Sequence, residues 1–454
     1  LFGVVACVPI GGRPVTRVLG IELRRSAAIG TTIILVVAGT LLLFFAEGID
    51  FATGWMQLAM TQRLYLAVLW PLAMAAGAWQ ARREHRSKVA ELFASTPRPA
   101  AHRTVPTLGA MAVAVVCGYL AMGVAGGLWI IGTAEYFPVS VLVVTAVGCL
   151  ALIAAAWLGL AIGRLLPSPV TAPALAVAGL ALLLLIPGAT RPRGWLALVF
   201  SPIYEMNMPD AYATVPGRAS AAQATWLAAL TVTAVMLFVS SGWRIRVAAL
   251  LPVVLGATLA ITVMPHHNRV VNNAIDPVAR ELVCAEGEPR VCVSRVHSGL
   301  LPEIAPKARE ALTILAKLPD PPAQVHEDTT TYGPDFAPPW QKDVVLYRVE
   351  AGQNGHLANE THALAEMVSG AFSTPPGCEH YADPSESLAA AYWLIGREPA
   401  ADDTYDPDVI PEAVGMWQNL RKLPDTKAKA LVVTLRRAAQ NCSVGDGVLP
   451  GSKR

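Results

Sequence analysis

The chain has 454 residues, of which 54% are hydrophobic and 15% are charged, and its mean hydropathy is +0.46. A soluble domain carries about 25% charged residues, so this composition excludes an ordinary soluble enzyme and a disordered chain. The net charge of +2 hides a division between two halves. Residues 1–264 hold 17 Lys/Arg and 8 Asp/Glu, whereas residues 265–454 hold 18 and 25. A basic apolar half followed by an acidic polar half indicates a membrane domain joined to a water-exposed domain.

Seven stretches of the first half approach the roughly 20 apolar residues that a helix needs to cross a bilayer. They are residues 29–47, 64–81, 106–132, 138–163, 169–187, 224–241 and 247–264. The sequence therefore predicts a polytopic α-helical membrane protein with about seven transmembrane helices and a transmembrane domain at 29–264. Residues 1–28 precede the first crossing, and the basic stretch within them predicts a cytoplasmic segment lying along the membrane interface.

The distribution of basic residues predicts the orientation of these crossings. With the N-terminus inside, the cytoplasmic loops would hold 13 Lys/Arg. The outer loops would hold only Arg63, Arg191, Arg193 and Arg218. Positive charge holds loops on the cytoplasmic side, so seven crossings place residues 265–454 outside. The abundance of Ala and of Arg over Lys favours a bacterial plasma membrane.

The segment after the second crossing, residues 82–97, predicts a short helix on the cytoplasmic surface. Val89, Leu92 and Phe93 fall at helical spacing and form one apolar face, and Pro97 ends the helix. This pattern, together with its position, resembles the coupling helix of ABC-2-type exporter permeases, and the resemblance extends over about residues 13–241. The residues that carry it are Glu84, Val89, Glu91, Leu92, Phe93, Ser95, Thr96 and Pro97.

The resemblance implies a partnership with other chains. In that family a cytoplasmic ATPase, which holds ATP and Mg²⁺, binds the coupling helices, and the permease pairs with a second copy or a related permease. This chain has no GxxxxGK[ST] phosphate loop, so we do not expect it to be an enzyme by itself. Two features depart from the family pattern, namely the seventh crossing and a long outer loop at 189–223. The crossings hold almost no ionisable residues, which favours an apolar or amphipathic substrate.

The second half predicts an extracytoplasmic α+β domain at 265–454. Strands are expected at 290–297 and 343–350, with a weaker one at 324–332. Helices are expected at 302–318, 357–372, 386–397, 410–423 and 426–440. The acidic charge of this half disfavours nucleic acid as a partner.

Four cysteines in this half predict disulfides, which form in an oxidising compartment. Cys284 and Cys292 flank a turn-like Glu-Gly-Glu-Pro segment and could join a hairpin. Cys378 and Cys442 would then pair by default. Four cysteines allow three connectivities, and this is the preferred one.

A histidine and two glutamates raise the question of a metal site. His362 and Glu366 lie one helical turn apart, and Glu386 begins the next helix. The stretch 357–397 resembles a degenerate zinc site of M1-type (gluzincin) peptidases. Ala363 stands at the position of the general base, and Glu366 stands at that of the second histidine ligand. We therefore expect neither peptidase activity nor a bound cofactor, and zinc at these three residues remains an alternative.

The function predicted from the sequence is a permease subunit of an ATP-driven exporter. Two other interpretations stay open. One is a membrane-anchored, inactive peptidase-like protein, and the other is a sensor or immunity protein that binds a ligand with its exported domain.

Overall fold

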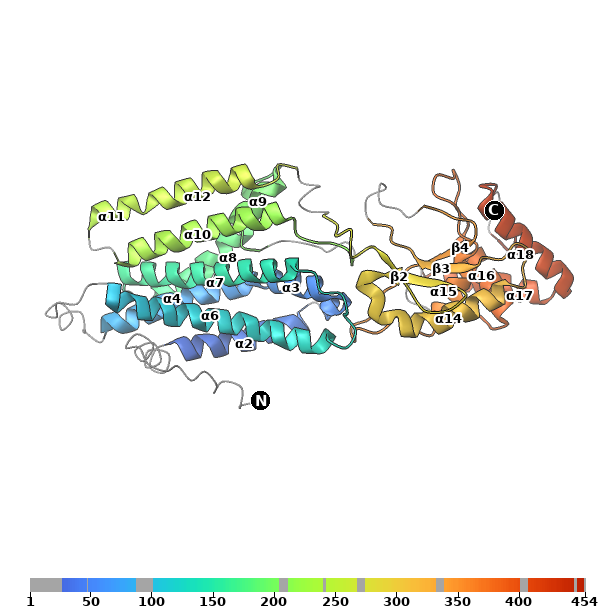
Figure 1. The fold of residues 1–454 in the computed structure, drawn as a ribbon, viewed down its shortest axis with the longest axis horizontal. Helices are drawn as coiled ribbons and strands as arrows, with labels where there is room; N and C mark the ends of the chain where they lie inside the picture. Colours follow the sequence, from blue (N-terminus) through green and yellow to red (C-terminus); the bar gives the residue numbers. More distant parts are fainter. Residues whose placement is uncertain are drawn as a thin grey trace.

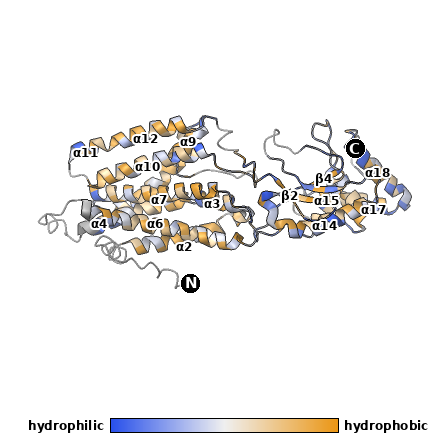
Figure 2. Cartoon of the chain, in the orientation of Figure 1, coloured by the Kyte–Doolittle hydropathy of each residue, from blue (hydrophilic) through white to orange (hydrophobic). Residues whose placement is uncertain are grey.

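The computed structural model describes residues 27–46, 48–86, 101–203, 211–239, 242–267, 274–331, 339–400, 407–444 and 447–452. The chain forms an elongated molecule with a helical bundle at one end and a smaller mixed C-terminal domain, residues 274–452, at the other (Figure 1). Figure 2 shows mainly apolar residues along the bundle helices, with hydrophilic residues at α11, whereas polar and apolar residues are interspersed in the C-terminal domain. This division matches the change of composition along the sequence.

Within the described residues, the bundle contains six helices that are long and apolar enough to cross a bilayer, and a bent helix pair that can count as a seventh span. The six are α2 (Ala28–Phe45), α6 (Ala101–Ile130), α7 (Ser140–Leu165), α8 (Thr171–Ala189), α10 (Gly217–Val239) and the run of α11 (Trp243–Ala248) with α12 (Leu250–Val263). The predicted set of about seven apolar helices is therefore confirmed as six or seven candidate spans, judged by length and composition. Short α9 (Gly194–Phe200) and the first turns of α10 occupy part of the outer loop predicted at 189–223.

The bent pair consists of α3 (Trp55–Leu64) and α4 (Leu66–Arg86), whose axes differ by 51°. The helix breaks at Tyr65. Pro71 then lies in the second turn of α4 and has no N–H to donate to the carbonyl four residues earlier. The backbone between these two residues therefore has fewer intrahelical hydrogen bonds than the rest of the span, and such sites are where helices bend.

Helix α3 corrects one prediction from the sequence. The outer loop was expected to run to Arg63, but Arg63 lies in α3 with 0% of its surface exposed. Its Nη2 donates to the Pro202 carbonyl at 2.8 Å and to Gln223 Oε1 at 3.0 Å, and its Nε donates to the same carbonyl at 3.1 Å. A buried charge is tolerated only when polar groups compensate it. These bonds therefore fix α3 to the segment after α9 and to α10.

The centre of the bundle is a close contact between α4 and α7. A Cβ on Gly77 would lie 2.1 Å from the Ala156 carbonyl oxygen, and one on Gly159 would lie 2.0 Å from the Met74 carbonyl oxygen. Two helices approach this closely only where neither carries a side chain, which is how small residues promote packing within membranes. By contrast, α8 and α12 leave many large apolar side chains exposed, as lipid-facing helices do.

This contact generates a stability prediction. Gly77→Val should disrupt the α4–α7 contact and destabilise the bundle by about 1–3 kcal/mol or more, because overpacking moves the backbone. Gly30→Val in α2 is the matched control, since nothing lies within 4 Å of a Cβ at that position. Thermal unfolding in detergent, followed by size-exclusion chromatography, measures the difference. Equal midpoints for the two variants would contradict the close contact.

The C-terminal domain contains a four-stranded sheet in the order β1-β2-β3-β4. Its strands are β1 (Leu282–Cys284), β2 (Val291–Ser294), β3 (Gln324–Glu327) and β4 (Val344–Tyr347). β1 pairs antiparallel with β2, while β2, β3 and β4 are parallel neighbours. The carboxyl ends of three strands therefore lie at one edge of the sheet, and that edge faces the bundle (Figure 1).

Helices cover the sheet and complete one hydrophobic core. α14 (Leu301–Leu315) connects β2 to β3, and four helices follow β4, namely α15 (Ala363–Gly370), α16 (Pro384–Ile395), α17 (Val409–Arg421) and α18 (Asp425–Gln440). The predicted α+β class is confirmed for the described residues. The strand expected at 290–297 ends at Ser294 and continues as the 3₁₀ helix η2 (Arg295–Leu300), the helix expected from 357 begins at Ala363, and β1 was not predicted.

Two disulfides join the expected cysteine pairs, Cys284–Cys292 and Cys378–Cys442. Cys284 and Cys292 face each other across the β1–β2 hairpin. Cys378 follows α15, and Cys442 follows α18. The second bridge therefore fixes the end of the last helix to the middle of the domain.

The two bridges should differ in their contribution to stability. They close loops with sequence separations of 8 and 64 residues. The chain-entropy relation then gives about 2.5 kcal/mol for the first and about 4 kcal/mol for the second. Replacing Cys378 and Cys442 by Ser should lower the urea midpoint of the domain more than replacing Cys284 and Cys292. A larger fall in the midpoint after replacing Cys284 and Cys292 would contradict this expectation.

Candidate functional site

The predicted ATPase-coupling residues fall largely outside the described part of the chain. Val89, Glu91, Leu92, Phe93, Ser95, Thr96 and Pro97 all lie outside the described residues, and Glu84 lies in the last turn of α4. The structure does place the helices on either side of them. α4 ends and α6 begins at the end of the bundle that faces away from the C-terminal domain, which we call the distal end (Figure 1).

The three candidate zinc ligands are not assembled into a metal site. Glu386 is buried, and its Oε1 accepts hydrogen bonds from the backbone amides of Val448 and Leu449, both at 2.7 Å. It therefore holds the C-terminal segment. His362 precedes α15, and its carbonyl accepts from the Glu366 amide at 3.0 Å. Among the described residues, no group of three or more His, Cys, Asp or Glu side chains is placed to hold a metal ion.

A buried polar cluster lies instead at the edge of the sheet that faces the bundle. Glu327 ends β3, and Ser294 ends the neighbouring parallel strand β2, so both reach the same edge. His297 follows in η2. Glu327 Oε2 accepts from the Ser294 amide at 2.6 Å, and Oε1 lies 2.7 Å from His297 Nδ1. Glu327 and His297 are only 2% and 3% exposed.

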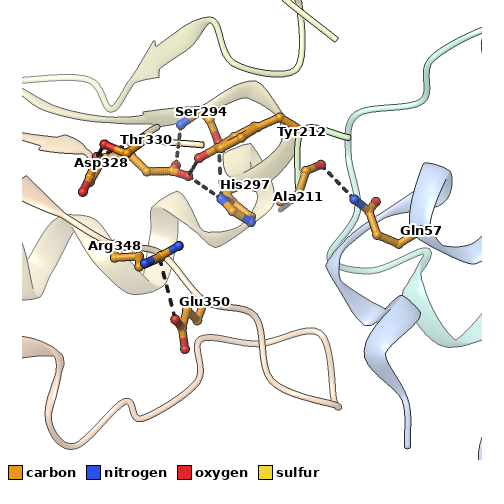
Figure 3. A network of polar contacts seen from close by, with 10 residues as sticks. Gln57, Ala211, Tyr212, Ser294, His297, Asp328, Thr330, Arg348 and Glu350 are labelled. Carbon is orange, nitrogen blue, oxygen red and sulfur yellow. Dashed lines mark hydrogen bonds and ion pairs between the residues drawn. The ribbon is translucent and has the colours of Figure 1, made fainter. Parts of the chain in front are cut away.

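The third partner of Glu327 belongs to the membrane half of the chain. The hydroxyl of Tyr212, which lies between α9 and α10, donates to Glu327 Oε1 across 115 positions of sequence. Figure 3 shows the Tyr212 ring extending toward His297 and Ser294. We call Tyr212, Ser294, His297 and Glu327 the junction cluster.

The electrostatics of the cluster keep Glu327 ionised. Burial alone would raise the pKa of its carboxyl, because a charge is less stable away from water. The neighbouring His297 and the hydrogen bonds from His297, Tyr212 and the Ser294 amide outweigh that effect. Together they hold the pKa of Glu327 below its usual value of 4.5. The cluster therefore contains a buried carboxylate stabilised by donors from both halves of the molecule.

Two further contacts join the halves beside this cluster. Tyr136, in the connection between α6 and α7, donates to Asp276 Oδ2 at 2.7 Å. Burial, together with this hydrogen bond, raises the pKa of Tyr136 to about 12, so the phenol remains a donor at neutral pH. Near the end of α6, Trp129 Nε1 donates to the Gln353 carbonyl at 2.9 Å. The docking of the C-terminal domain thus includes polar contacts from several elements, beside an apolar cluster in which Tyr212 packs with Ala279 and Val296.

The loop that presents Gln353 is itself held in place. Glu303 lies in the first turn of α14. Its Oε1 is 2.6 Å from His356 Nδ1, and its Oε2 accepts a hydrogen bond from the Leu357 amide at 2.9 Å. Gly355 adopts φ +78° and packs so close to Thr133 that a Cβ there would lie 2.4 Å from the Thr133 hydroxyl. A side chain is disfavoured at this positive φ, so the loop fits tightly against the end of α6.

The geometry of the junction cluster favours docking over catalysis. Ser294 Oγ and Glu327 Oε1 both approach the same ring nitrogen of His297, Nδ1, at 3.2 and 2.7 Å. A hydrolytic triad needs the acid and the nucleophile on opposite nitrogens. His297 Nε2 is buried and has no partner among the described residues. The cluster therefore acts as a buried connection between the two halves.

Comparison of the chain with protein-family models, with curated proteins and with solved structures finds no match. The assignment of a function therefore depends on the residues and their arrangement alone.

The junction cluster predicts a specific pH dependence. The pKa of Glu327 is lower in the folded state than its usual value of 4.5. The Glu327 carboxylate therefore stabilises the folded state fully above pH 4.5, and this stabilisation is lost as the pH falls through the folded-state pKa. At pH 7, Glu327→Gln should lower the stability of the docked C-terminal domain by about 1.5–3 kcal/mol, the strength of hydrogen bonds to a charged group. The difference from the unmodified protein should shrink below about pH 4.5.

Urea unfolding of the full chain in nanodiscs between pH 7 and pH 3.5 measures this difference. Glu350→Gln is the matched control, since Glu350 is exposed and its ion pair with Arg348 is long at 3.9 Å. Exposed pairs contribute little. A stability difference for Glu327→Gln that does not change with pH would refute an ionised buried carboxylate.

Proposed function

We propose that this chain is the membrane-spanning permease subunit of an ATP-driven exporter, with ATP and Mg²⁺ bound by a separate cytoplasmic ATPase. The observation that supports the proposal best is that α4 ends and α6 begins at the distal end of the bundle (Figure 1). In the sequence these two helices flank residues 87–100. This is the segment whose sequence resembles an ATPase-coupling helix, and the distal end is where a cytoplasmic motor could reach it.

Charge and disulfides support the orientation that this function requires. Several basic residues of the described helices lie near the distal end, namely Arg82, Arg83, Arg164, Arg244 and Arg246. The positive-inside tendency assigns such an end to the cytoplasm. The two disulfides lie in the C-terminal domain at the opposite end, which fits an oxidising compartment outside. We therefore propose a bacterial plasma membrane protein with its C-terminal domain outside.

The composition of the spans supports a class of substrate. Apart from the polar residues of α3, the described helices of the bundle are largely apolar, and the buried Arg63 lies in the bent span with polar partners of its own. Proton-coupled transporters place carboxylates or histidines in their pathways. An apolar or amphipathic substrate moved by an external ATPase fits this bundle better, and a second permease copy or a related permease would complete the pathway.

The alternative functions use the C-terminal domain differently. An active peptidase would need an assembled metal site, and Glu386 is instead engaged by two backbone amides. The inactive peptidase-like domain expected from the sequence has no such requirement. A ligand-binding sensor remains compatible with the docked domain, since a sensor must transmit binding to the bundle. Stimulation of an ATPase partner by the intact chain separates the exporter from the sensor.

The proposal predicts that the apolar face of the 82–97 segment binds the ATPase. Phe93→Asp should abolish co-purification of the ATPase, because burying a phenylalanine contributes about 1.5–3 kcal/mol and an unpaired buried carboxylate costs at least as much. Glu91→Ala should affect stimulated ATP turnover more than assembly, since one charge at the rim of an interface adds little affinity. Pull-down of the ATPase and its turnover in nanodiscs measure both effects.

Ser87→Asp provides the matched control. By helical spacing, position 87 lies on the face opposite Val89, Leu92 and Phe93, so it adds the same charge away from the expected contact. Disulfide formation in the C-terminal domain confirms that each variant has folded. Retention of the ATPase by Phe93→Asp would remove the main support for the exporter.

A further inference from the structure

The C-terminal domain docks on elements other than the helix from which the chain enters it. The chain leaves the bundle after α12, yet the contacts of the domain come from the end of α6, from the α6–α7 connection and from residues 211–216. Docking is thus sensitive to the positions of helices that have no direct covalent connection to the domain.

Residues 211–216 are held from both sides, and we call them the strap. On the bundle side, Gln57 Nε2 of α3 donates to the Ala211 carbonyl at 2.9 Å. On the other side, Tyr212 donates to Glu327 of the junction cluster. Figure 3 shows the Ala211 carbonyl directed toward Gln57, and the adjacent Tyr212 directed toward the sheet of the C-terminal domain. Ala211 and Tyr212, which are adjacent in the sequence, therefore contact α3 and the C-terminal domain, respectively.

The strap is also paired with the start of the C-terminal domain. The Thr214 amide donates to the Ala274 carbonyl, and the Asp276 amide donates to the Tyr212 carbonyl, both at 2.9 Å. Ala213 and Ile275 form an isolated antiparallel bridge. Displacement of the strap would thus move both Tyr212 and the segment that leads into β1.

Helix α3, which holds the strap, is joined to α4 at the bend of 51°. The strap also packs against α3, because its buried Val215 belongs to one apolar cluster with Met56 and Met60. A change in the bend would shift Gln57 and, through its hydrogen bond, the Ala211 carbonyl.

We propose that the strap couples the bend between α3 and α4 to the docking of the C-terminal domain. In the docked arrangement seen here, Gln57 holds Ala211 and Tyr212 completes the set of donors around Glu327. When the bend changes, Gln57 displaces the strap, the Tyr212 hydroxyl leaves Glu327, and the domain loosens from the bundle. This coupling is a property of the folded chain, and it holds whether or not an ATPase drives α4.

Hydrogen exchange of the full chain in nanodiscs, followed by mass spectrometry, tests the coupling. The readout is the set of peptides that contain the amides of Ser294, Thr214 and Asp276. Tyr212→Phe should raise exchange at Ser294 about 10-fold, because it removes one hydrogen bond to the buried carboxylate that this amide also contacts. Gln57→Ala should raise exchange at the same amide, although Gln57 lies in the membrane half, because it removes the hydrogen bond from α3 to the strap carbonyl. The double variant should match Tyr212→Phe alone, since both changes act through one strap.

Two controls separate coupling from general destabilisation. Gln62→Ala removes another buried glutamine of α3 that has no described bond to the strap, and Tyr381→Phe removes a hydroxyl from an exposed tyrosine. Neither should change exchange at Ser294. The proposal is overturned if Gln57→Ala affects only α3 and the strap, or if Gln62→Ala has the same effect on Ser294 as Gln57→Ala. Additive effects of Gln57→Ala and Tyr212→Phe would also overturn it, since they require separate routes.

Discussion

The arrangement of the two halves depends on one buried carboxylate. Glu327 lies between the sheet and the bundle with 2% of its surface exposed, and a buried charge without partners would cost several kcal/mol. His297 and the Ser294 amide provide two of its contacts from within the C-terminal domain. The third comes from Tyr212, in the membrane half. The Glu327 carboxylate therefore has all three of these contacts only when the C-terminal domain is docked on the bundle.

This constraint gives the bundle two regions with different roles. The α4–α7 contact brings backbone against backbone at Gly77 and Gly159, and such a contact resists small adjustments. Helix α3, by contrast, meets α4 at a bend, and polar bonds from Arg63 and Gln57 hold it in place. Polar bonds can exchange partners at lower cost than a close-packed surface can rearrange. A change in the bend would therefore have to break or exchange the polar bonds of α3, and through Gln57 it would reach the strap.

The sequence was sufficient for features that depend on local composition. Span length and apolarity belong to each helix separately, so the polytopic architecture could be predicted. The pairing of Cys284 with Cys292 followed from the turn between them. Helix α3 was missed because Gln57, Gln62 and Arg63 make it too polar to look like a span. Their burial depends on partners such as Gln223, which lies 160 positions from Arg63, and no local pattern reveals such a contact.

The junction cluster could not be predicted for the same reason. Its members come from positions 212, 294, 297 and 327, and the weak strand expected at 324–332 did not identify Glu327 as the residue at its end. A signal was present, since polar residues that follow parallel strands gather at one edge of a sheet, but β2 and β3 had not been recognised as parallel neighbours. The candidate zinc residues were chosen by spacing alone, and spacing did not reveal that Glu386 bonds to the amides of Val448 and Leu449. The coupling segment at 82–97 remains a prediction from sequence.

A double-mutant cycle on Tyr212→Phe and Glu327→Gln tests the central claim most directly. The urea unfolding free energy of the C-terminal domain is measured at pH 7 in the full chain, for the unmodified protein, both single variants and the double variant. If the Tyr212 hydroxyl stabilises the buried Glu327 carboxylate, the two changes should be non-additive by about 1.5–3 kcal/mol. A coupling energy indistinguishable from zero would show that the two halves do not share this charge, and it would contradict the account.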